Sequence, residues 1–283
     1  MFMNILPLDK KIQVLSSLVE GNSIRATSRM TGVAKGTINR FLERVGRACS
    51  KYQDIVLRDL TCTNIQCDEI WSFCYAKEKN VPETHKGEFG YGDIWTWVAI
   101  DADTKLVPSW SVGLRNPEYA NAFMQDLKSR LTNRVQLTTD GHGLYLWAVE
   151  KAFGSEVDYA MLVKIYGKQP DGEKRYSPTD CIATRQEVLQ GNPDIKNIST
   201  SYIERQNLTM RMNMRRFTRL TNAFSKKIEN LEYAVSLHFM YYNFCRPHKT
   251  LNPKAVGITP AMAAGVSSKR WTLEDIIYLT ESN

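Results

Sequence analysis

The stretch Asn64-Ile-Gln-Cys-Asp-Glu-Ile-Trp-Ser-Phe-Cys-Tyr75 alternates in polarity and is rich in aromatic and β-branched residues. That pattern predicts a β-strand. Asp68 lies inside this strand among apolar neighbours. A carboxylate in a strand interior is costly unless something pairs with it. Asp68 is therefore the first candidate for a functional residue.

The segments on both sides of this strand predict a mixed α/β domain. Two further strands, 93–101 and 106–113, are joined by a turn at 101–105 and extend the first into an antiparallel meander. Apolar periodicity then predicts, in order, a helix at 117–130, a strand at 135–140, a helix at 143–153, a strand at 159–165 and a helix from about Ser199. This order indicates a sheet with helices on both faces.

Residues 166–198 show no clear period. We interpret them as an irregular insertion, with a short helix at 183–190 or with a small β element that contacts DNA or a partner subunit.

The N-terminal fifty residues predict three helices, at 8–20, 24–31 and 35–48. Gly32 supplies the bend between the second and third helices, and Ser28, four residues earlier, is small. This spacing predicts a helix-turn-helix, with apolar residues filling the wedge between its helices. Those residues are Val33, Ile38 and Phe41. The alternative is a three-helix core without a DNA role.

Charge favours the DNA-binding interpretation. The net charge is +7, and the first fifty residues hold eight Lys or Arg against three Asp or Glu. A second basic run, 205–227, has seven basic residues and no acidic one. Basic clusters attract phosphate polyanions. The third helix would enter the major groove with its N-terminal half, and the candidate contacts are Lys35, Thr37, Asn39 and Arg40.

Bulk composition fits an ordinary globular protein. The 283 residues are 43% hydrophobic and 24% charged, enough for one large domain or two modest ones. We expect no membrane span, no secretory signal and reduced thiols for the six cysteines, and hence a cytoplasmic protein.

Two further acids resemble Asp68 in their placement. Asp140 ends a predicted strand, and Glu204 lies near the start of a predicted helix. Carboxylate oxygens are ligands that Mg²⁺ prefers. Two such ions can activate an attacking oxygen and stabilise a leaving one in phosphodiester chemistry. Spacing alone does not bring the three acids together.

The chain resembles the DDE transposases of bacterial insertion sequences, in the retroviral-integrase and ribonuclease-H-like superfamily. Four segments in a shared order carry the resemblance. They are Cys67–Trp71, Leu137–Gly141, Tyr202–Asn207, and Tyr242–Leu251 followed by Thr259–Ala261.

This resemblance implies a ribonuclease-H-like mixed sheet flanked by helices, with an N-terminal all-α helix-turn-helix domain. It implies a catalytic triad of Asp68, Asp140 and Glu204 that holds two Mg²⁺, with Mn²⁺ as an alternative. Similar proteins often carry a basic residue seven positions after the glutamate, where this chain has Arg211. We expect phosphate contacts from one face of that helix: Arg211, Arg215, Arg216 and Arg219.

The expected division of the chain is 1–50 for the DNA-binding domain, 51–62 for a linker, 63–253 for the catalytic domain and 254–283 for a tail. The implied function is to bind the inverted repeats of its element and to catalyse metal-dependent strand cleavage and transfer. Two element ends must be joined, so we expect at least a homodimer on double-stranded DNA. The alternatives are a nuclease of the same fold and a DNA-binding regulator with an inactive catalytic domain.

Several residues have competing interpretations. Glu69 adjoins Asp68, but strand alternation directs it to the opposite sheet face. Asp101 and Asp103 fit a turn better than a metal site. His142 is either structural or a phosphate contact, and Arg246 and His248 are either structural or DNA contacts. Zinc ligation is a weak interpretation, because the candidate ligands match no common spacing. Those candidates are Cys62, Cys67, Cys74 and His85. We expect no N-terminal zinc. The tryptophans at 71, 95, 97 and 110 fit packing roles.

Overall fold

The computed structural model describes residues 6–167, 179–218, 222–252 and 257–281. Its strands are β1 Asn64–Cys74, β2 Gly92–Asp101, β3 Ser109–Gly113, β4 Val135–Asp140, β5 Val157–Tyr166 and β6 Cys181–Gln190. Its α-helices are α1 Leu8–Val19, α2 Ile24–Thr31, α3 Lys35–Val56, α4 Pro117–Ser129, α5 Leu144–Phe153, α6 Ser201–Asn213, α7 Ile228–Met240, α8 Pro260–Ala263 and α9 Leu273–Tyr278.

The strands form one mixed sheet in the order β3-β2-β1-β4-β5-β6. β1, β2 and β3 are antiparallel neighbours, as the meander predicted. Helices α4 and α5 are crossovers that return the chain to the same end of the sheet, so β4 and β5 run parallel to β1. The expected mixed α/β architecture is confirmed, and the arrangement is compatible with a ribonuclease-H-like fold.

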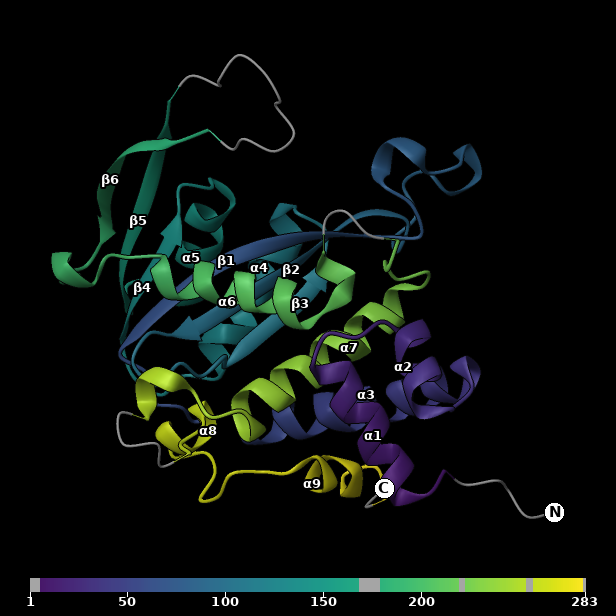
Figure 1. The fold of residues 1–283 in the computed structure, drawn as a ribbon. Coiled ribbons are helices and arrows are strands. Elements are labelled where there is room, and N and C mark those ends of the chain that lie inside the picture. The colour runs from purple at the N-terminus through teal and green to yellow at the C-terminus, as the bar shows by residue number, and fades with distance from the viewer. Residues whose placement is uncertain (1–5, 168–178, 219–221, 253–256, 282–283) are drawn as a thin grey trace.

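Helices cover both faces of the sheet (Figure 1). Alternation along the strands divides the apolar side chains between the two faces. Cys67 and Trp97 are buried in the core on the α4–α5 side. Ile70 and Val98 are buried in the core on the α6–α7 side. The central strand β1 is thus enclosed on both sides, and any polar group inside it must find a partner in the protein.

The N-terminal helices pack on this body through α3 and α7. Ser236 donates a hydrogen bond from its hydroxyl to the backbone oxygen of Gly46 at 2.9 Å. The side chain of Gln53 donates to the backbone oxygen of Ser236 at 3.1 Å. A Cβ atom at Gly46 would lie 2.4 Å from Cβ of Tyr233, so the close approach of the two helices requires glycine there.

The α2–α3 turn has the expected features. Gly32 has φ 72°, a left-handed conformation that favours glycine. Val33, Ile38 and Phe41 are buried behind the turn. Helix α3 continues to Val56, beyond the expected end at residue 48. No helix in the described ranges is both long and apolar enough to cross a membrane.

The segment after β5 corrects one prediction. The short helix expected at 183–190 is wrong, because residues Cys181–Gln190 form strand β6. β6 pairs antiparallel with β5, and the two strands project from the edge of the sheet (Figure 1). The hydrogen bonds of β5 supply a partner that the local sequence does not reveal, and the Ile, Thr and Val content of the segment suits a strand. Residues 168–178 of the expected insertion lie outside the described residues.

The end of α6 corrects a second prediction. A continuous helix was expected to carry a track of arginines, but α6 ends at Asn213. Met214 is extended, with φ −129° and ψ 108°, and a short 3-10 turn follows at Arg215–Phe217. This break lets both Met214 and Phe217 enter the core. Arg219 lies outside the described residues.

Candidate active site

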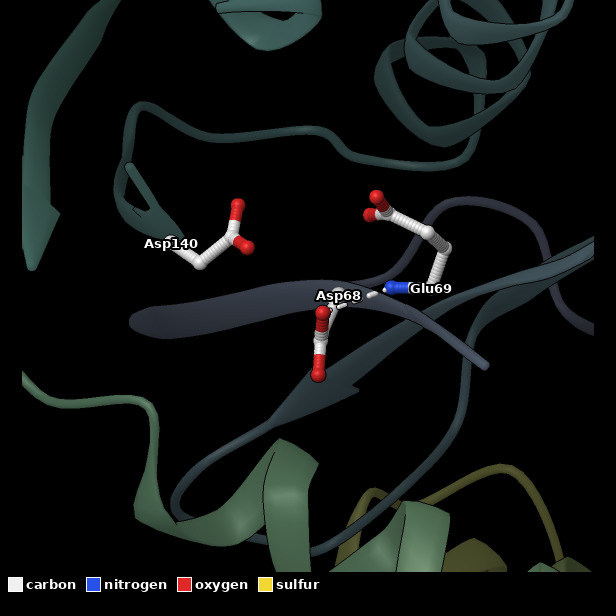
Figure 2. Close-up of side chains that lie close together, drawn as sticks. All are labelled: Asp68, Glu69 and Asp140. Carbon is white, nitrogen blue, oxygen red and sulfur yellow. Dashed lines mark hydrogen bonds between the residues drawn. The ribbon is translucent and has the colours of Figure 1, made fainter. Parts of the chain in front are cut away.

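Asp68 and Asp140 lie next to each other on neighbouring parallel strands. The register of β1 and β4 sets Cys67 beside Thr139, so the next residue of each strand is an aspartate. One carboxylate oxygen each from Asp68, Glu69 and Asp140 lies within 4.8 Å of the others. Figure 2 shows Asp140 and Glu69 on one side of the β1 ribbon and the Asp68 carboxylate directed to the other side, toward α6.

Asp68 is half-buried and hydrogen-bonded at both oxygens. Its Oδ2 accepts a hydrogen bond from Nδ2 of Asn207 on α6 at 2.8 Å, and its Oδ1 accepts from the backbone N–H of Glu69 at 2.8 Å. Burial, followed by the neighbouring carboxylates of Glu69 and Asp140, raises the pKa of Asp68 to about 7 from an ordinary 3.8. The ionised form therefore lacks sufficient positive charge around it.

Glu204 comes from the first turn of α6, which faces the Asp68 side of the sheet. It lies three residues before Asn207, so both share one helix face. Its Oε1 pairs with Nζ of Lys164 on β5 and accepts a hydrogen bond from the Thr200 hydroxyl. Glu204 also contributes to the raised pKa of Asp68, although it is outside the 4.8 Å cluster.

Glu69 occupies the opposite face, as alternation predicted, and is 6% exposed. Its Oε1 accepts from Nε of Arg115 at 2.6 Å, and its Oε2 accepts from the hydroxyl of Tyr145 on α5 at 2.8 Å. The guanidinium of Arg115 lies over the ring of Trp95, 4.5 Å from its centroid. Both oxygens of Glu69 thus already have donors within the protein.

The donor set suits a hard divalent cation. Carboxylate oxygens are the ligands of Mg²⁺ and related ions. The Asp68 carboxylate is held among two further carboxylates, and a bound cation would favour its ionised form. The cluster can therefore hold a divalent metal. In the described ranges it is the one group of three or more acidic, His or Cys side chains with that geometry.

His142, Asp101 and His248 each form hydrogen bonds with residues close to them in the sequence. The backbone N–H of His142 donates to Oδ1 of Asp140 at 3.0 Å, and His142 Nδ1 accepts from the backbone N–H of Leu144 at 3.3 Å, which is a structural turn. Asp101 accepts from the Thr104 backbone N–H at 3.1 Å, which is a turn role. His248 Nδ1 lies 2.9 Å from Oγ1 of Thr250.

The expected DNA contacts fall in two groups. Lys35, Asn39 and Arg40 are exposed at the start of α3, and Thr37 is half-buried. Arg211 lies in the last turn of α6, and Arg215 is exposed on the 3-10 turn that follows.

Arg216 differs from the other expected contacts. It is half-buried, and its Nη1 donates to Oγ of Ser225 at 2.7 Å. Its guanidinium is therefore held by the protein rather than displayed on a helix face.

Sequence reasoning did not find the partners that organise the acids. Lys164 lies on β5, Tyr145 on α5 and Arg115 in the connection between β3 and α4. The order of strands in the sheet brings these three residues to the site. Asn207 was noticed only for sharing a helix face with Glu204. Its role toward Asp68 depends on how α6 crosses the sheet, which no local signal encodes.

No protein-family model and no curated protein sequence match this chain. Among solved structures, it is similar to the Mos1 mariner paired end complex with Mn, with 12% sequence identity and a TM-score of 0.21. The match covers 56% of this chain and 61% of that chain, so the chain spans about three fifths of the length of its structural neighbour. A likeness at this level establishes no family, and the function must be inferred from the residues themselves.

Proposed function

We propose that the chain is a metal-dependent DNA transposase of the DDE type. The observation that carries the proposal is a pair of acids on adjacent strands, Asp68 inside β1 and Asp140 at the end of β4, with a third acid on α6 at the Asp68 side of the sheet. Asp68 and Asp140 lie on adjacent strands, and Glu204 is held opposite Asp68 one helical turn before Asn207. This is the set of three carboxylates that the sequence resemblance implies.

In this proposal the metal ligands are Asp68, Asp140 and Glu204, and the cofactor is Mg²⁺, as two ions, or Mn²⁺. The metal would supply positive charge for the attacking and leaving oxygens of the phosphodiester. The residues of the chain hold the ligands in place: Asn207 orients Asp68 through Oδ2, and Lys164 neutralises Glu204. Glu69 supports the site from the other face through Tyr145 and Arg115.

The reaction has two balanced steps. Water attacks the phosphodiester at the end of the element, the bond from phosphorus to the 3′ oxygen breaks, and a 3′-hydroxyl is freed. That hydroxyl then attacks a phosphodiester of target DNA, and the target strand leaves with its own 3′-hydroxyl. The number of phosphodiester bonds is conserved in the second step, so no external energy source is needed.

We propose that residues 1–50 bind the inverted repeats through the α2–α3 helix-turn-helix, with 51–62 as a linker, 63–253 as the catalytic domain and 254–283 as a tail. The exposed start of α3 and the left-handed Gly32 support this proposal. Joining two element ends requires at least a dimer on DNA. A bacterial transposase with chromosomal substrate would work in the cytoplasm, at the nucleoid.

Strand cleavage by the full-length chain tests this proposal. The substrate is a labelled duplex that carries the terminal repeats found beside the gene, with Mg²⁺. We expect cleavage by the wild type, and a loss of about a thousandfold or more in Asp68→Asn, Asp140→Asn and Glu204→Gln with duplex binding retained. The control is Glu150→Gln, which alters an exposed acid on α5.

The products separate the alternatives. Joined strands together with cleavage identify a transposase, and cleavage without joining identifies a nuclease of the same fold. Metal-independent binding with no cleavage by the wild type would overturn the enzyme proposal and favour the regulator. Full cleavage in any one acid variant would remove that residue from the site.

A further inference from the structure

A cleft of about 980 Å³ separates the N-terminal helices from the end of α6 and the start of α7. Five cationic residues line it, from both sides: Arg25, Lys35, Arg215, Arg216 and Lys226. Five amide side chains line it as well: Asn22, Asn39, Asn213, Asn222 and Asn230. Among the described residues that line the cleft, none is acidic. Cations and amides without carboxylates form a surface that attracts an anion.

The cleft cations have no ion-pair partner among the described residues. Within the described part of the chain, none of the five forms an ion pair with a carboxylate. Arg216 is the most informative, because burial lowers its pKa to about 10 and its hydrogen-bond partner is the neutral hydroxyl of Ser225. A half-buried charge that has no partner of opposite sign is costly, and an anion in the cleft would lower that cost.

A buried histidine in the cleft wall gives an independent indication of a ligand. His238 is 5% exposed and lines the cleft. Its Nε2 is buried and has no hydrogen-bond partner among the described residues. Burial lowers the pKa of His238 to about 3, so the ring is neutral and offers one N–H donor. Buried polar atoms in native proteins normally have partners, so a ligand that forms a hydrogen bond with Nε2 would satisfy this atom.

We propose that this cleft binds the phosphate backbone of a single strand of DNA. The proposal rests on the DNA-processing function proposed above and assigns the cleft a substrate. The volume is at the upper end of the roughly 300–1,000 Å³ range of ligand pockets. That is room for a few nucleotides but not for a duplex, whose major groove alone is about 12 Å wide. Phe224 also lines the cleft, with Nζ of Lys226 4.1 Å from its ring centroid. The Phe224 ring also contacts the ring of Phe73, with centroids 4.7 Å apart, so this residue holds Lys226 at the wall of the cleft.

Helix α6 connects the cleft to the acids. It carries Glu204 in its first turn and ends at Asn213 in the cleft wall. At 1.5 Å per residue, these positions are about 14 Å apart along the helix axis. That distance equals about four stacked nucleotides at 3.4 Å each. If a strand is held in the cleft, the phosphodiester that lies about four nucleotides further along that strand would reach the acids.

Binding of labelled oligonucleotides to the full-length chain tests the cleft. The probes are a 12-nucleotide oligo(dT) and a duplex that carries the terminal repeats, followed by fluorescence anisotropy over a range of salt. The variant Lys226→Ala removes a cleft cation that lies outside residues 1–50, the segment proposed to bind the duplex. Its matched control is Lys79→Ala, at an exposed lysine elsewhere.

We expect Lys226→Ala to bind oligo(dT) about three- to tenfold more weakly at low salt. The slope of log affinity against log salt should fall by about 0.7, the value for one phosphate contact of a single strand. Duplex binding and the control variant should remain within twofold of the wild type. If the cleft variant binds oligo(dT) with the same affinity and the same salt slope as the wild type, the proposal is overturned. Equal losses for duplex and oligo(dT) would also overturn it, because the cleft would then contact a duplex.

A second variant addresses the histidine. His238→Leu removes the unpaired Nε2 while keeping an apolar side chain in the wall. We expect a higher melting temperature for the free protein, together with oligo(dT) binding weaker by about tenfold. A lower melting temperature with unchanged binding would show that His238 is purely structural and would remove it from the site.

Two further measurements separate this proposal from its premise. Asp68→Asn should keep wild-type affinity for oligo(dT), since the acid lies outside the cleft. Retained strand binding in a chain that never cleaves DNA would leave the cleft proposal standing and overturn only the enzyme. The second measurement is competition with inorganic phosphate. If millimolar phosphate displaces oligo(dT), and the slope of log affinity for oligo(dT) against log salt is near one, the cleft is a small-anion site and the single-strand proposal is overturned.

Discussion

Asn207 on α6 donates a hydrogen bond from Nδ2 to Oδ2 of Asp68 on β1, at 2.8 Å. This contact fastens the helix that carries Glu204 to the strand that carries the first aspartate. Asn207 is 8% exposed, and its Oδ1 has no partner among the described residues. The amide is therefore placed to hold a carboxylate and is poorly suited to a purely structural role.

The isosteric change Asn207→Asp tests that relationship. It sets a second carboxylate against Asp68, and a like charge at hydrogen-bond distance raises the pKa of both groups. Because Asp68 must be ionised to bind a cation, we expect the acid limb of the pH–rate profile to move about one unit toward alkaline pH. At pH 7, close to the pKa of Asp68, this is about a fivefold loss of cleavage, and it approaches tenfold at lower pH. An unshifted profile in Asn207→Asp would show that the contact does not reach the chemistry.

The raised pKa of Asp68 makes stability depend on pH. Its pKa is about 7 in the folded chain against an ordinary 3.8, so folding favours the protonated form. The contribution of Asp68 to the free energy of unfolding is fully present below pH 3.8, and it is lost as the pH rises through 7. In EDTA we expect wild-type stability to fall relative to Asp68→Asn between pH 4 and 8, by about 1.4 kcal/mol per unit of pKa difference.

Urea unfolding of both proteins at several pH values measures this difference. Adding Mg²⁺ or Mn²⁺ at pH 8 should restore the wild type and leave Asp68→Asn almost unchanged, because only the wild type offers the full set of ligands. Parallel pH curves in EDTA would contradict the prediction.

Tyr145 supports the site through Glu69. Tyr145→Phe removes one hydroxyl and leaves Oε2 of a buried carboxylate without its donor. We expect a loss of about 1–3 kcal/mol in unfolding free energy. Metal affinity should fall by up to about tenfold, because Glu69 lies within 4.8 Å of Asp68 and Asp140 and would lose the hydrogen bond that positions it. Calorimetric unfolding and Mn²⁺ titration measure both effects, and Tyr166→Phe, at an exposed tyrosine, is the control. If Tyr145→Phe binds Mn²⁺ as tightly as the wild type, Glu69 has only a structural role.

The sequence predicted those parts of the fold that depend on local pattern. Alternation identified β1 with Asp68 inside it, and the end of an apolar run located Asp140 at the end of β4. Sequence pattern left residues 183–190 open between a short helix and a small β element, and strand β6 shows that the helix was wrong. The strand depends on pairing with β5, which the local residues do not reveal. The end of α6 was missed because the burial of Met214 and Phe217, which no helical period shows, interrupts the helix.

The site was predicted less completely than the fold. Alternation correctly placed Glu69 and Asp68 on opposite faces of the sheet, but it gives no distance between their carboxylates. Both side chains lie beside Asp140, and their oxygens come within 4.8 Å of it and of each other. The pairing of Lys164 with Glu204 depends on β5 lying next to β4 in the sheet, which only the folded chain establishes.

Lys164 competes with a cation for Glu204. The ammonium group neutralises the carboxylate in an ion pair whose side chains are 28% and 41% exposed. Lys164→Met keeps the length of the side chain and removes its charge, so the site becomes more negative. We expect Mn²⁺ to bind about tenfold more tightly, as measured by calorimetry. The positive ammonium group no longer repels the metal ion or occupies the carboxylate of Glu204. Lys164→Arg keeps the charge and should bind as the wild type does. Weaker binding in Lys164→Met would show that the lysine assembles the site instead.

Two glycines of α3 make opposite predictions for the same substitution. A Cβ at Gly46 would lie 2.4 Å from Cβ and 2.6 Å from Cα of Tyr233, whereas a Cβ at Gly36 meets nothing within 4 Å. Alanine favours a helix over glycine by up to about 1 kcal/mol. We therefore expect Gly36→Ala to be stabilising, by about 0.5 kcal/mol at this first turn of the helix. Gly46→Ala should instead be destabilising by about 1–3 kcal/mol, because it overpacks the contact of α3 with α7.

The contact at Gly46 also forms part of the body on which the cleft is built. Gly46→Ala should therefore weaken oligo(dT) binding, while the α2–α3 turn keeps its duplex affinity. Chemical unfolding together with the two anisotropy probes measures all three quantities. Equal stabilisation by alanine at both glycines would show that α3 does not pack closely on α7, and the cleft would then lose its fixed wall.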